Sequence, residues 1–202
     1  MPPLDTALPL LLLCGALGYL FGSIPFGLVF ARLFGLGDIR QIGSGNIGAT
    51  NVLRTGNKLA AALTLIFDAG KAGMAVLAAR AVAGEDAAQL AGLAAFFGHC
   101  FPIWLRFKGG KGVATFIGLM LALHWPAGLA TCATWLVIAA LFRYSSLAAM
   151  FAGLMAPILL LFTGYGIGIV MGVLLGILIY WRHGENIARL RAGTETKIGQ
   201  KG

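Results

Sequence analysis

Six long apolar segments account for most of this sequence, and they constrain its fold more than any other feature. They cover residues 8–30, 59–82, 87–105, 126–142, 147–163 and 165–181. A helix needs about 20 apolar residues to cross the hydrocarbon core of a bilayer, and about 17 suffice. Charged residues make up only 11% of the chain, whereas soluble domains contain about 25%. We therefore predict an all-α integral membrane protein.

A shorter apolar segment, residues 113–124, decides the number of crossings. It is short for a transmembrane helix, although flanking residues could extend it. If it crosses, the chain has about seven transmembrane helices. If it and one neighbour do not cross, the chain has five, and the charge distribution fits that number as well. We favour seven.

The basic residues give the orientation. With seven crossings, one side of the membrane receives a large set of cations: Arg32, Arg40, Arg54, Lys58, Arg106, Lys108, Lys111, Arg143, Arg182, Arg189, Arg191, Lys197 and Lys201. Cytoplasmic loops are rich in Lys and Arg, so we place the N-terminus outside and the C-terminus in the cytoplasm. The same rule accounts for the net charge of +8, and we expect no nucleic-acid partner.

The sequence KGGKGVAT, residues 108–115, has the composition of an anion-binding loop. Glycines let backbone N–H groups point toward one ligand, and the N-terminus of the following helix adds partial positive charge. Lys108 and Lys111 would add full charges. The spacing does not fit a Walker A loop. The alternative is a flexible basic loop without a ligand.

A second polar segment, GSGNIGATN at residues 43–51, is followed closely by Arg54. Ser44 and Thr50 would donate hydroxyl hydrogen bonds to a phosphate, and Arg54 would present its planar guanidinium. Alternatively, Thr50 and Asn51 cap the turn that carries Arg54. The spacing alone leaves both functions open.

Two more polar groups stand next to apolar segments. Ser145 and Ser146 follow Arg143, and they could donate to an anion or cap the next helix. His183 and Asn186 come just after the last apolar segment. On a continuing helix these two residues share one face, which could look into a site at the membrane surface.

Asp68 and Lys71 place two charges inside an apolar segment. Each costs about 2.5 to 3.5 kcal/mol on insertion scales, and a mutual pair at i and i+3 would reduce that cost. Contact with a headgroup phosphate is the alternative. The sequence has no metal-ligand cluster, no G-x-S-x-G turn and no H-x-x-x-x-D pair. We expect no metal and no cofactor.

Taken together, five motifs resemble one family closely. They are GSIPFG at 22–27, GSGNIGATNVLR at 43–54, FDAGKA at 67–72, GHCFPIWLRFKGGKGVAT at 98–115 and RHGENIARLRAGTE at 182–195. In this order they are similar to the PlsY family of bacterial membrane glycerol-3-phosphate acyltransferases, which use acyl phosphate as donor. The similarity covers nearly the whole chain.

The resemblance implies a reaction and a location. Acyl phosphate and glycerol 3-phosphate would give 1-acyl-glycerol 3-phosphate (lysophosphatidate) and phosphate, the first step of bacterial phospholipid synthesis. The chain would form a single transmembrane acyltransferase domain, residues 1–202, in the cytoplasmic (inner) membrane. Its partners would be these two substrates and membrane lipid.

The resemblance also implies the site residues. The catalytic residues carried over by motif are Ser44, Arg54, Lys108, His183 and Asn186. The substrate-binding residues are Thr50, Asn51, Gly109, Gly110, Lys111, Gly112, Ser145 and Ser146. The glycine loop would take the phosphate of glycerol 3-phosphate. The proton of the attacking hydroxyl would pass either to a phosphate oxygen or to His183.

The alternative function is transport of an organic phosphate anion. Several spans together with a phosphate site would suit a transporter. Transporters, however, place their sites near the bilayer midplane on broken helices. Here the polar segments gather at one predicted face, which favours the enzyme.

Overall fold

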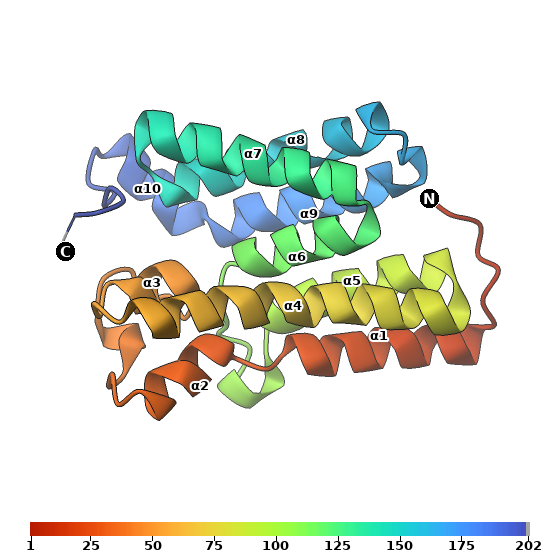
Figure 1. Ribbon diagram of the computed structural model, residues 1–202, viewed down its shortest axis with the longest axis horizontal. Coiled ribbons are helices and arrows are strands. Elements are labelled where there is room, and N and C mark those ends of the chain that lie inside the picture. Colours follow the sequence, from red (N-terminus) through yellow and green to blue (C-terminus); the bar gives the residue numbers. More distant parts are fainter. Residues whose placement is uncertain (201–202) are drawn as a thin grey trace. The chain divides into compact units, whose positions relative to one another are not determined.

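The computed structural model describes residues 1–200, and within this range every regular element is a helix. Of the predicted cytoplasmic cations, Lys201 lies outside the described residues. The chain divides into two compact units: an N-terminal unit, Pro3–Leu123, and a C-terminal unit that begins at His124 and includes Met1–Pro2. Figure 1 shows the helices of each. The prediction of an all-α chain is confirmed.

The N-terminal unit begins with a broken apolar segment. Its elements are α1 (Leu8–Gly22), α2 (Phe26–Leu33), η1 (Ile39–Gln41), α3 (Ala49–Leu53), α4 (Lys58–Ala83), α5 (Glu85–Cys100), η2 (Ile103–Leu105) and α6 (Val113–Leu123). The predicted segment 8–30 is therefore two helices, separated at Ser23–Pro25. The break occurs because Pro25 has no N–H to continue the helical hydrogen-bond pattern.

Small residues let α1 pack closely on α5. A Cβ atom added at Gly18 would lie 2.4 Å from the carbonyl oxygen of Ala91, and one at Gly22 would lie 2.2 Å from that of Ala95. Glycines four residues apart form a flat stripe on a helix, which is typical of transmembrane helix pairs. The pattern G-x-x-x-G thus holds these two helices together.

The helices α4 and α5 form an antiparallel pair, so α4 begins at the end of the unit where α5 finishes. Asn57 caps the start of α4, where its Oδ1 accepts from the N–H of Ala60 at 2.9 Å. The segment before α4 and the segment after α5 consequently share one end of the unit. Both carry predicted site residues.

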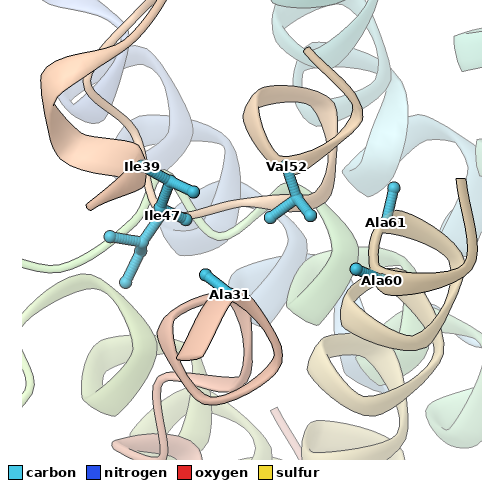
Figure 2. Packing of buried hydrophobic residues seen from close by; sticks show 6 residues of the cluster. All are labelled: Ala31, Ile39, Ile47, Val52, Ala60 and Ala61. Carbon is cyan, nitrogen blue, oxygen red and sulfur yellow. The ribbon is translucent and has the colours of Figure 1, made fainter. Parts of the chain in front are cut away.

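A small apolar core stabilises the segment before α4. Ala31, Ile39, Ile47, Val52, Ala60 and Ala61 are buried together (Figure 2). Leu105 of η2 packs against the same cluster. The chain leading into the glycine loop is thereby anchored to the core beneath residues 43–54.

The C-terminal unit contains α7 (Trp125–Phe142), α8 (Ser145–Phe162), η3 (Gly166–Gly168), α9 (Ile169–Arg182) and α10 (Gly184–Arg191). Helix α9 packs closely on α8, because a Cβ at Gly172 would lie 2.9 Å from Pro157. The axis bends by 59° between α9 and α10. This bend brings the end of α9 to the polar C-terminal segment.

Five helices in the described residues are long and apolar enough to cross a membrane, or six if the bent pair is one span. Helix α6 has only 11 residues, about 16 Å at 1.5 Å per residue, and the hydrocarbon core is about 30 Å thick. The chain has the helices of a multi-pass membrane protein. The count of seven and the orientation stay predictions.

Candidate active site

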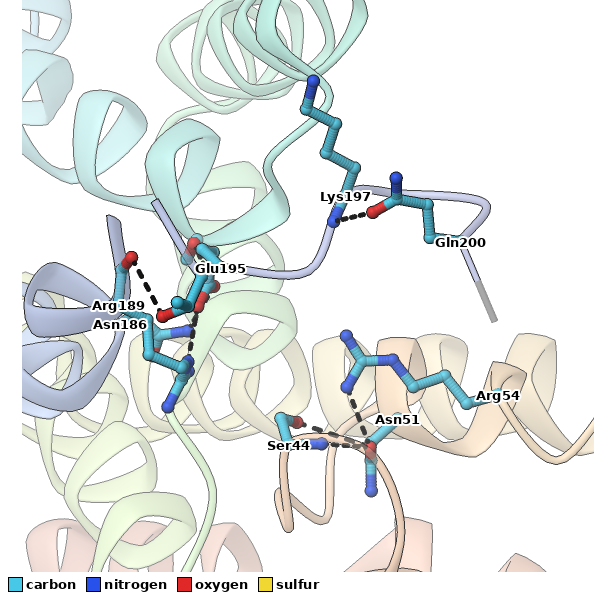
Figure 3. Close-up of polar contacts among 10 residues, drawn as sticks. Ser44, Asn51, Arg54, Asn186, Arg189, Glu195, Lys197 and Gln200 are labelled. Carbon is cyan, nitrogen blue, oxygen red and sulfur yellow. Dashed lines mark hydrogen bonds and ion pairs between the residues drawn. The ribbon is translucent and has the colours of Figure 1, made fainter. Parts of the chain in front are cut away.

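Asn51 organises the polar segment at residues 43–54. Its Oδ1 accepts from the N–H of Ser44 at 3.1 Å, from the Ser44 hydroxyl at 3.3 Å and from Arg54 Nη1 at 3.4 Å (Figure 3). Its Nδ2 donates to the carbonyl of Ile39 at 2.7 Å. The buried amide therefore fixes Ser44 and Arg54 relative to each other.

The capping interpretation of Thr50 and Asn51 is wrong. Both residues lie inside α3, whose N-cap is Gly48 and has no side-chain cap. The side chain of Thr50 is exposed, and Arg54 is partly exposed just after the helix. The side chains of Thr50 and Arg54 are therefore accessible to a ligand, whereas that of Asn51 is buried.

Gly43 is required by a close approach. Its φ is +53°, and a Cβ there would lie 2.6 Å from Nη1 of Arg54 and 2.7 Å from Oδ1 of Asn51. An L side chain is disfavoured at this φ and would displace the guanidinium. The glycine thus allows Ser44, Asn51 and Arg54 to lie together.

The glycine loop differs from its predicted form. The N–H of Gly109 donates to the carbonyl of Cys100 at 3.1 Å, and that of Gly110 donates to the carbonyl of His99 at 3.1 Å. These two N–H groups are used inside the fold, so they do not point toward a ligand. Gly112, with φ +79°, makes the turn into α6.

An anion site at this loop would consequently be formed by the start of α6. The first N–H groups of a helix have no partner within the helix and carry partial positive charge. Lys108 is exposed and Lys111 partly exposed beside this turn. Gly109 and Gly110 contribute by packing on α5, since an added Cβ at Gly109 would lie 2.2 Å from the carbonyl oxygen of His99.

The C-terminal unit contains a polar cluster around Glu195. Glu195 Oε1 accepts from Ser146 Oγ at 2.6 Å and from Asn186 Nδ2 at 2.6 Å. Arg189 Nε donates to Oε2 at 2.6 Å, and Figure 3 shows Arg189 and Asn186 on the same side of Glu195. Partial burial raises the pKa of Glu195, but these three donors outweigh it and hold the pKa below its usual value.

Glu195 is the residue that the sequence reasoning missed. Glu195 is the last residue of the motif RHGENIARLRAGTE. Its contact with Ser146, 49 positions earlier, could not be predicted from the spacing of residues in the sequence. The cluster also distinguishes the two serines, because Ser146 is buried and bonded to Glu195 while Ser145 is partly exposed. Helix α8 has no side-chain cap, so neither serine caps it.

His183 is buried at the junction of α9 and α10. Its Nδ1 lies 2.7 Å from the carbonyl oxygen of Ile179. A carbonyl oxygen only accepts, so Nδ1 carries the proton, and in the neutral ring Nε2 is the basic nitrogen. The ring therefore has the tautomer that a general base at Nε2 requires.

The helix does not continue straight past His183, as the i and i+3 argument assumed. Helix α9 ends at Arg182, and α10 leaves at 59°. His183 is both the C-cap of α9 and the N-cap of α10, and its carbonyl accepts the first hydrogen bond of α10 from the Ile187 N–H at 2.9 Å. His183 and Asn186 are both buried at this bend.

Inside the N-terminal unit, the expected mutual pair is present. Lys71 Nζ lies 2.8 Å from Asp68 Oδ1, and both side chains are buried. No group of three or more His, Cys, Asp or Glu residues within the described part of the chain could hold a metal ion.

Comparison with known proteins now identifies the family. The family model described as glycerol-3-phosphate acyltransferase matches residues 12–193. The chain belongs to the glycerol-3-phosphate acyltransferase family. A relative of that name from Ruegeria sp. (strain TM1040) is 66% identical over the whole of both chains. Another, from Ruegeria pomeroyi, is 61% identical over 100% of this chain and 99% of its own length.

Solved structures of this family have the same fold. The chain is similar to crystal structures of PlsY, an integral membrane glycerol 3-phosphate acyltransferase. The glycerol 3-phosphate form is 40% identical, with a TM-score of 0.88, and the match covers 94% of this chain and 96% of that chain. The lysophosphatidic acid form matches with 38% identity, a TM-score of 0.85 and coverage of 94% and 95%. The family resemblance predicted from the motifs is confirmed, and it favours the enzyme over the transporter.

Proposed function

We propose that this chain transfers an acyl group from acyl phosphate to glycerol 3-phosphate, giving 1-acyl-glycerol 3-phosphate and phosphate. The family match over residues 12–193 carries this proposal, because it includes every proposed site residue. For the same reason we propose that the chain acts as one acyltransferase domain, residues 1–202. The acyl donor rests on the motif resemblance.

The proposed chemistry needs little activation of the donor. An acyl phosphate is a mixed anhydride, and phosphate is a good leaving group. The hydroxyl of glycerol 3-phosphate attacks the carbonyl carbon, a new C–O ester bond forms and the bond to the phosphate oxygen breaks. Negative charge grows on the carbonyl oxygen and on the leaving phosphate, so donors and cations placed there lower the barrier.

Each proposed residue has a role that follows from its side chain. Arg54 and Ser44, held together by Asn51, would bind one phosphate. Lys108, Lys111 and the first N–H groups of α6 would hold the other phosphate, and Gly109, Gly110 and Gly112 would shape the turn that leads to them. Asn186, whose amide has two donor hydrogens, would donate to a substrate as well as to Glu195. The single hydroxyl hydrogen of Ser146 is already donated to Glu195, so Ser146 would hold Glu195 in place. Thr50 is exposed one residue before Asn51, and Ser145 is partly exposed one residue before Ser146.

The proton of the attacking hydroxyl has two proposed destinations. One is an oxygen of a substrate phosphate. The other is Nε2 of His183, because its Nδ1 already donates to Ile179 and leaves Nε2 as the basic nitrogen. A pH profile of kcat/KM that loses its acidic limb in His183→Asn would assign the proton to His183.

We further propose seven crossings in the bacterial cytoplasmic (inner) membrane, with the N-terminus outside and the C-terminus inside. Helix α6 alone is too short, and flanking residues would complete its crossing. The cationic segments then all face the cytoplasm.

The test is an assay with purified protein in detergent. Radiolabelled glycerol 3-phosphate is incubated with acyl phosphate, and labelled lysophosphatidate is measured after extraction into organic solvent. We expect labelled lipid only when acyl phosphate is present. No labelled lipid from folded protein would refute the proposal.

A further inference from the structure

Three buried ionisable side chains in the N-terminal unit have no part in the proposed chemistry. Lys71 Nζ lies 2.8 Å from Asp68 Oδ1, 2.9 Å from His99 Nδ1 and 2.8 Å from the carbonyl oxygen of Ile24. His99 and Asp68 side chains are 4% and 2% exposed, and that of Lys71 is 0% exposed. Such a cluster is costly to place in a membrane helix.

Stability alone is a weak reason for this cluster. Replacing a buried ion pair with well-packed apolar residues is often neutral or stabilising. The three groups lie on α4 and α5, which pack on each other and also carry the buried apolar residues Ala72, Val76 and Phe96. The position of the cluster suggests a more specific role.

The contacts of Lys71 determine the tautomer of His99. An ammonium group has three donors and no acceptor, and Nζ has three acceptors around it. An amine is a stronger base than an imidazole, so the proton belongs to Lys71, and Nδ1 of His99 accepts. The neutral ring then carries its own proton on Nε2.

The Nε2 atom of His99 lies beside Gly110 in the glycine loop. A Cβ added at Gly110 would lie 2.2 Å from His99 Nε2, so this atom occupies the side of Gly110 from which a side chain would project. The backbone of the same residue holds the loop too, because the His99 carbonyl accepts from the Gly110 N–H at 3.1 Å. Gly110 has no positive φ, so packing on His99 is the reason for a glycine here.

We propose that His99, fixed by Lys71 and Asp68, is a positioning residue for the loop that binds glycerol 3-phosphate. Its Nε2–H side supports the backbone at Gly110 and thereby sets the position of Lys111 and of the start of α6. None of the three residues touches substrate. This inference rests on the proposed function, because it assigns the support of the acceptor's phosphate-binding loop.

Two substitutions of His99 separate this role from a purely structural one. In His99→Gln, the amide reaches about as far as Nε2 and can support the loop, but Lys71 loses its acceptor. In His99→Asn, the amide oxygen can accept from Lys71, but nothing reaches the loop. If His99 supports the loop, His99→Gln should raise the KM for glycerol 3-phosphate less than His99→Asn does. If His99 only pairs with Lys71, His99→Asn should have the smaller effect.

The measurement is steady-state kinetics of the purified full chain with each substrate varied in turn. For His99→Asn we expect the KM for glycerol 3-phosphate to rise at least about fivefold, while the KM for acyl phosphate and kcat stay within about twofold. For His99→Gln we expect the KM for glycerol 3-phosphate within about threefold of wild type. Equal effects of both variants, the reverse order, or an unchanged KM would overturn the inference.

A double-variant cycle with Gly110→Ala gives a second readout. The added methyl meets Nε2 in the wild type, but the shorter asparagine side chain of His99→Asn leaves room for it in the double variant. We expect Gly110→Ala to raise the KM for glycerol 3-phosphate in the wild type by about tenfold and to add less than about twofold in the His99→Asn background. Additive effects would contradict support of the loop through this contact.

Controls keep the outcome interpretable. His124→Asn, which changes a histidine stacked on Tyr165 in the other unit, should leave both KM values unchanged. If His99→Asn does not accumulate as folded protein, the Asp68→Asn/Lys71→Met double variant removes the support of Nδ1 without leaving a lone charge. It should raise the KM for glycerol 3-phosphate at least about threefold, and an unchanged KM overturns the inference. An inactive wild type would refute the proposed function instead.

Discussion

At the scale of single residues, two acceptor side chains hold the proposed site groups in place. Asn51 accepts from Ser44 and Arg54, and Glu195 accepts from Ser146, Asn186 and Arg189. These two acceptors fix the direction of the donor side chains before a substrate binds, which reduces the conformational entropy lost on binding. Their removal should therefore affect several site residues at once.

Arg54→Lys tests whether the guanidinium geometry matters. Lys keeps the charge but cannot make the planar two-point contact with a phosphate, and it loses the bond to Asn51. We expect kcat/KM to fall at least about tenfold, as expected for losing one charge-assisted hydrogen bond, with unchanged thermal stability. The matched control is Arg40→Lys, at an exposed arginine paired with Asp38 in the same segment. Near-normal turnover in Arg54→Lys would mean that only charge is needed.

Glu195→Gln tests the cluster through pH. The folded state lowers the pKa of Glu195 from its ordinary 4.5, so its ionised form stabilises the fold above that value, and this contribution is lost as the pH falls through the lowered pKa. We expect the variant to unfold at a lower temperature than wild type at pH 7, with a smaller difference at pH 4. Glu185→Gln, at an exposed carboxylate, is the control. If the difference in unfolding temperature between wild type and Glu195→Gln is as large at pH 4 as at pH 7, the ionised form of Glu195 does not stabilise the fold in this way.

At the scale of elements, small residues decide which helices lie together. Apolar length predicted the helices well, because a chain in lipid must satisfy its backbone hydrogen bonds internally. Length did not reveal the break at Ser23–Pro25 or the bend at His183, because the length of an apolar segment does not show where its helix is interrupted. Nor did it reveal that the N–H groups of Gly109 and Gly110 are bonded to α5.

The α1–α5 contact offers a direct test at this scale. Gly22→Ala would place Cβ 2.2 Å from the carbonyl oxygen of Ala95, so the helices must separate. We expect a loss of stability of about 1 to 3 kcal/mol, as for overpacking in a core, measured by thermal or denaturant unfolding in detergent. Gly70→Ala on α4, where a Cβ meets nothing within 4 Å, is the matched control. Equal stability of the two variants would contradict the close packing.

At the scale of the whole molecule, the sequence predicted the class and family correctly. The apolar segments and the ordered set of glycine motifs were sufficient for both. The grouping of site residues was only partly predictable. Ser44 and Arg54 lie together as expected, but the role of Asn51 between them, and the whole cluster at Glu195, depend on tertiary contacts that no spacing encodes.

Orientation in the membrane can be tested with single cysteines in a background where Cys14, Cys100 and Cys132 are replaced. Thr194→Cys and Gly166→Cys are both exposed, and a Cβ at Gly166 meets nothing within 4 Å. Seven crossings predict that a membrane-impermeant thiol reagent labels Gly166→Cys in intact cells and labels Thr194→Cys only after lysis. Labelling of both from outside would contradict the proposed topology.

Acyl transfer from acyl phosphate to glycerol 3-phosphate is tested by measuring both products with purified protein. Lysophosphatidate and inorganic phosphate are quantified together, with acyl phosphate or acyl-CoA as the only donor. We expect acyl phosphate to give the two products in a ratio of about one to one, as the balanced reaction requires, and acyl-CoA to give neither at a comparable rate. Turnover of acyl-CoA as fast as acyl phosphate, or phosphate release without lysophosphatidate, would contradict it.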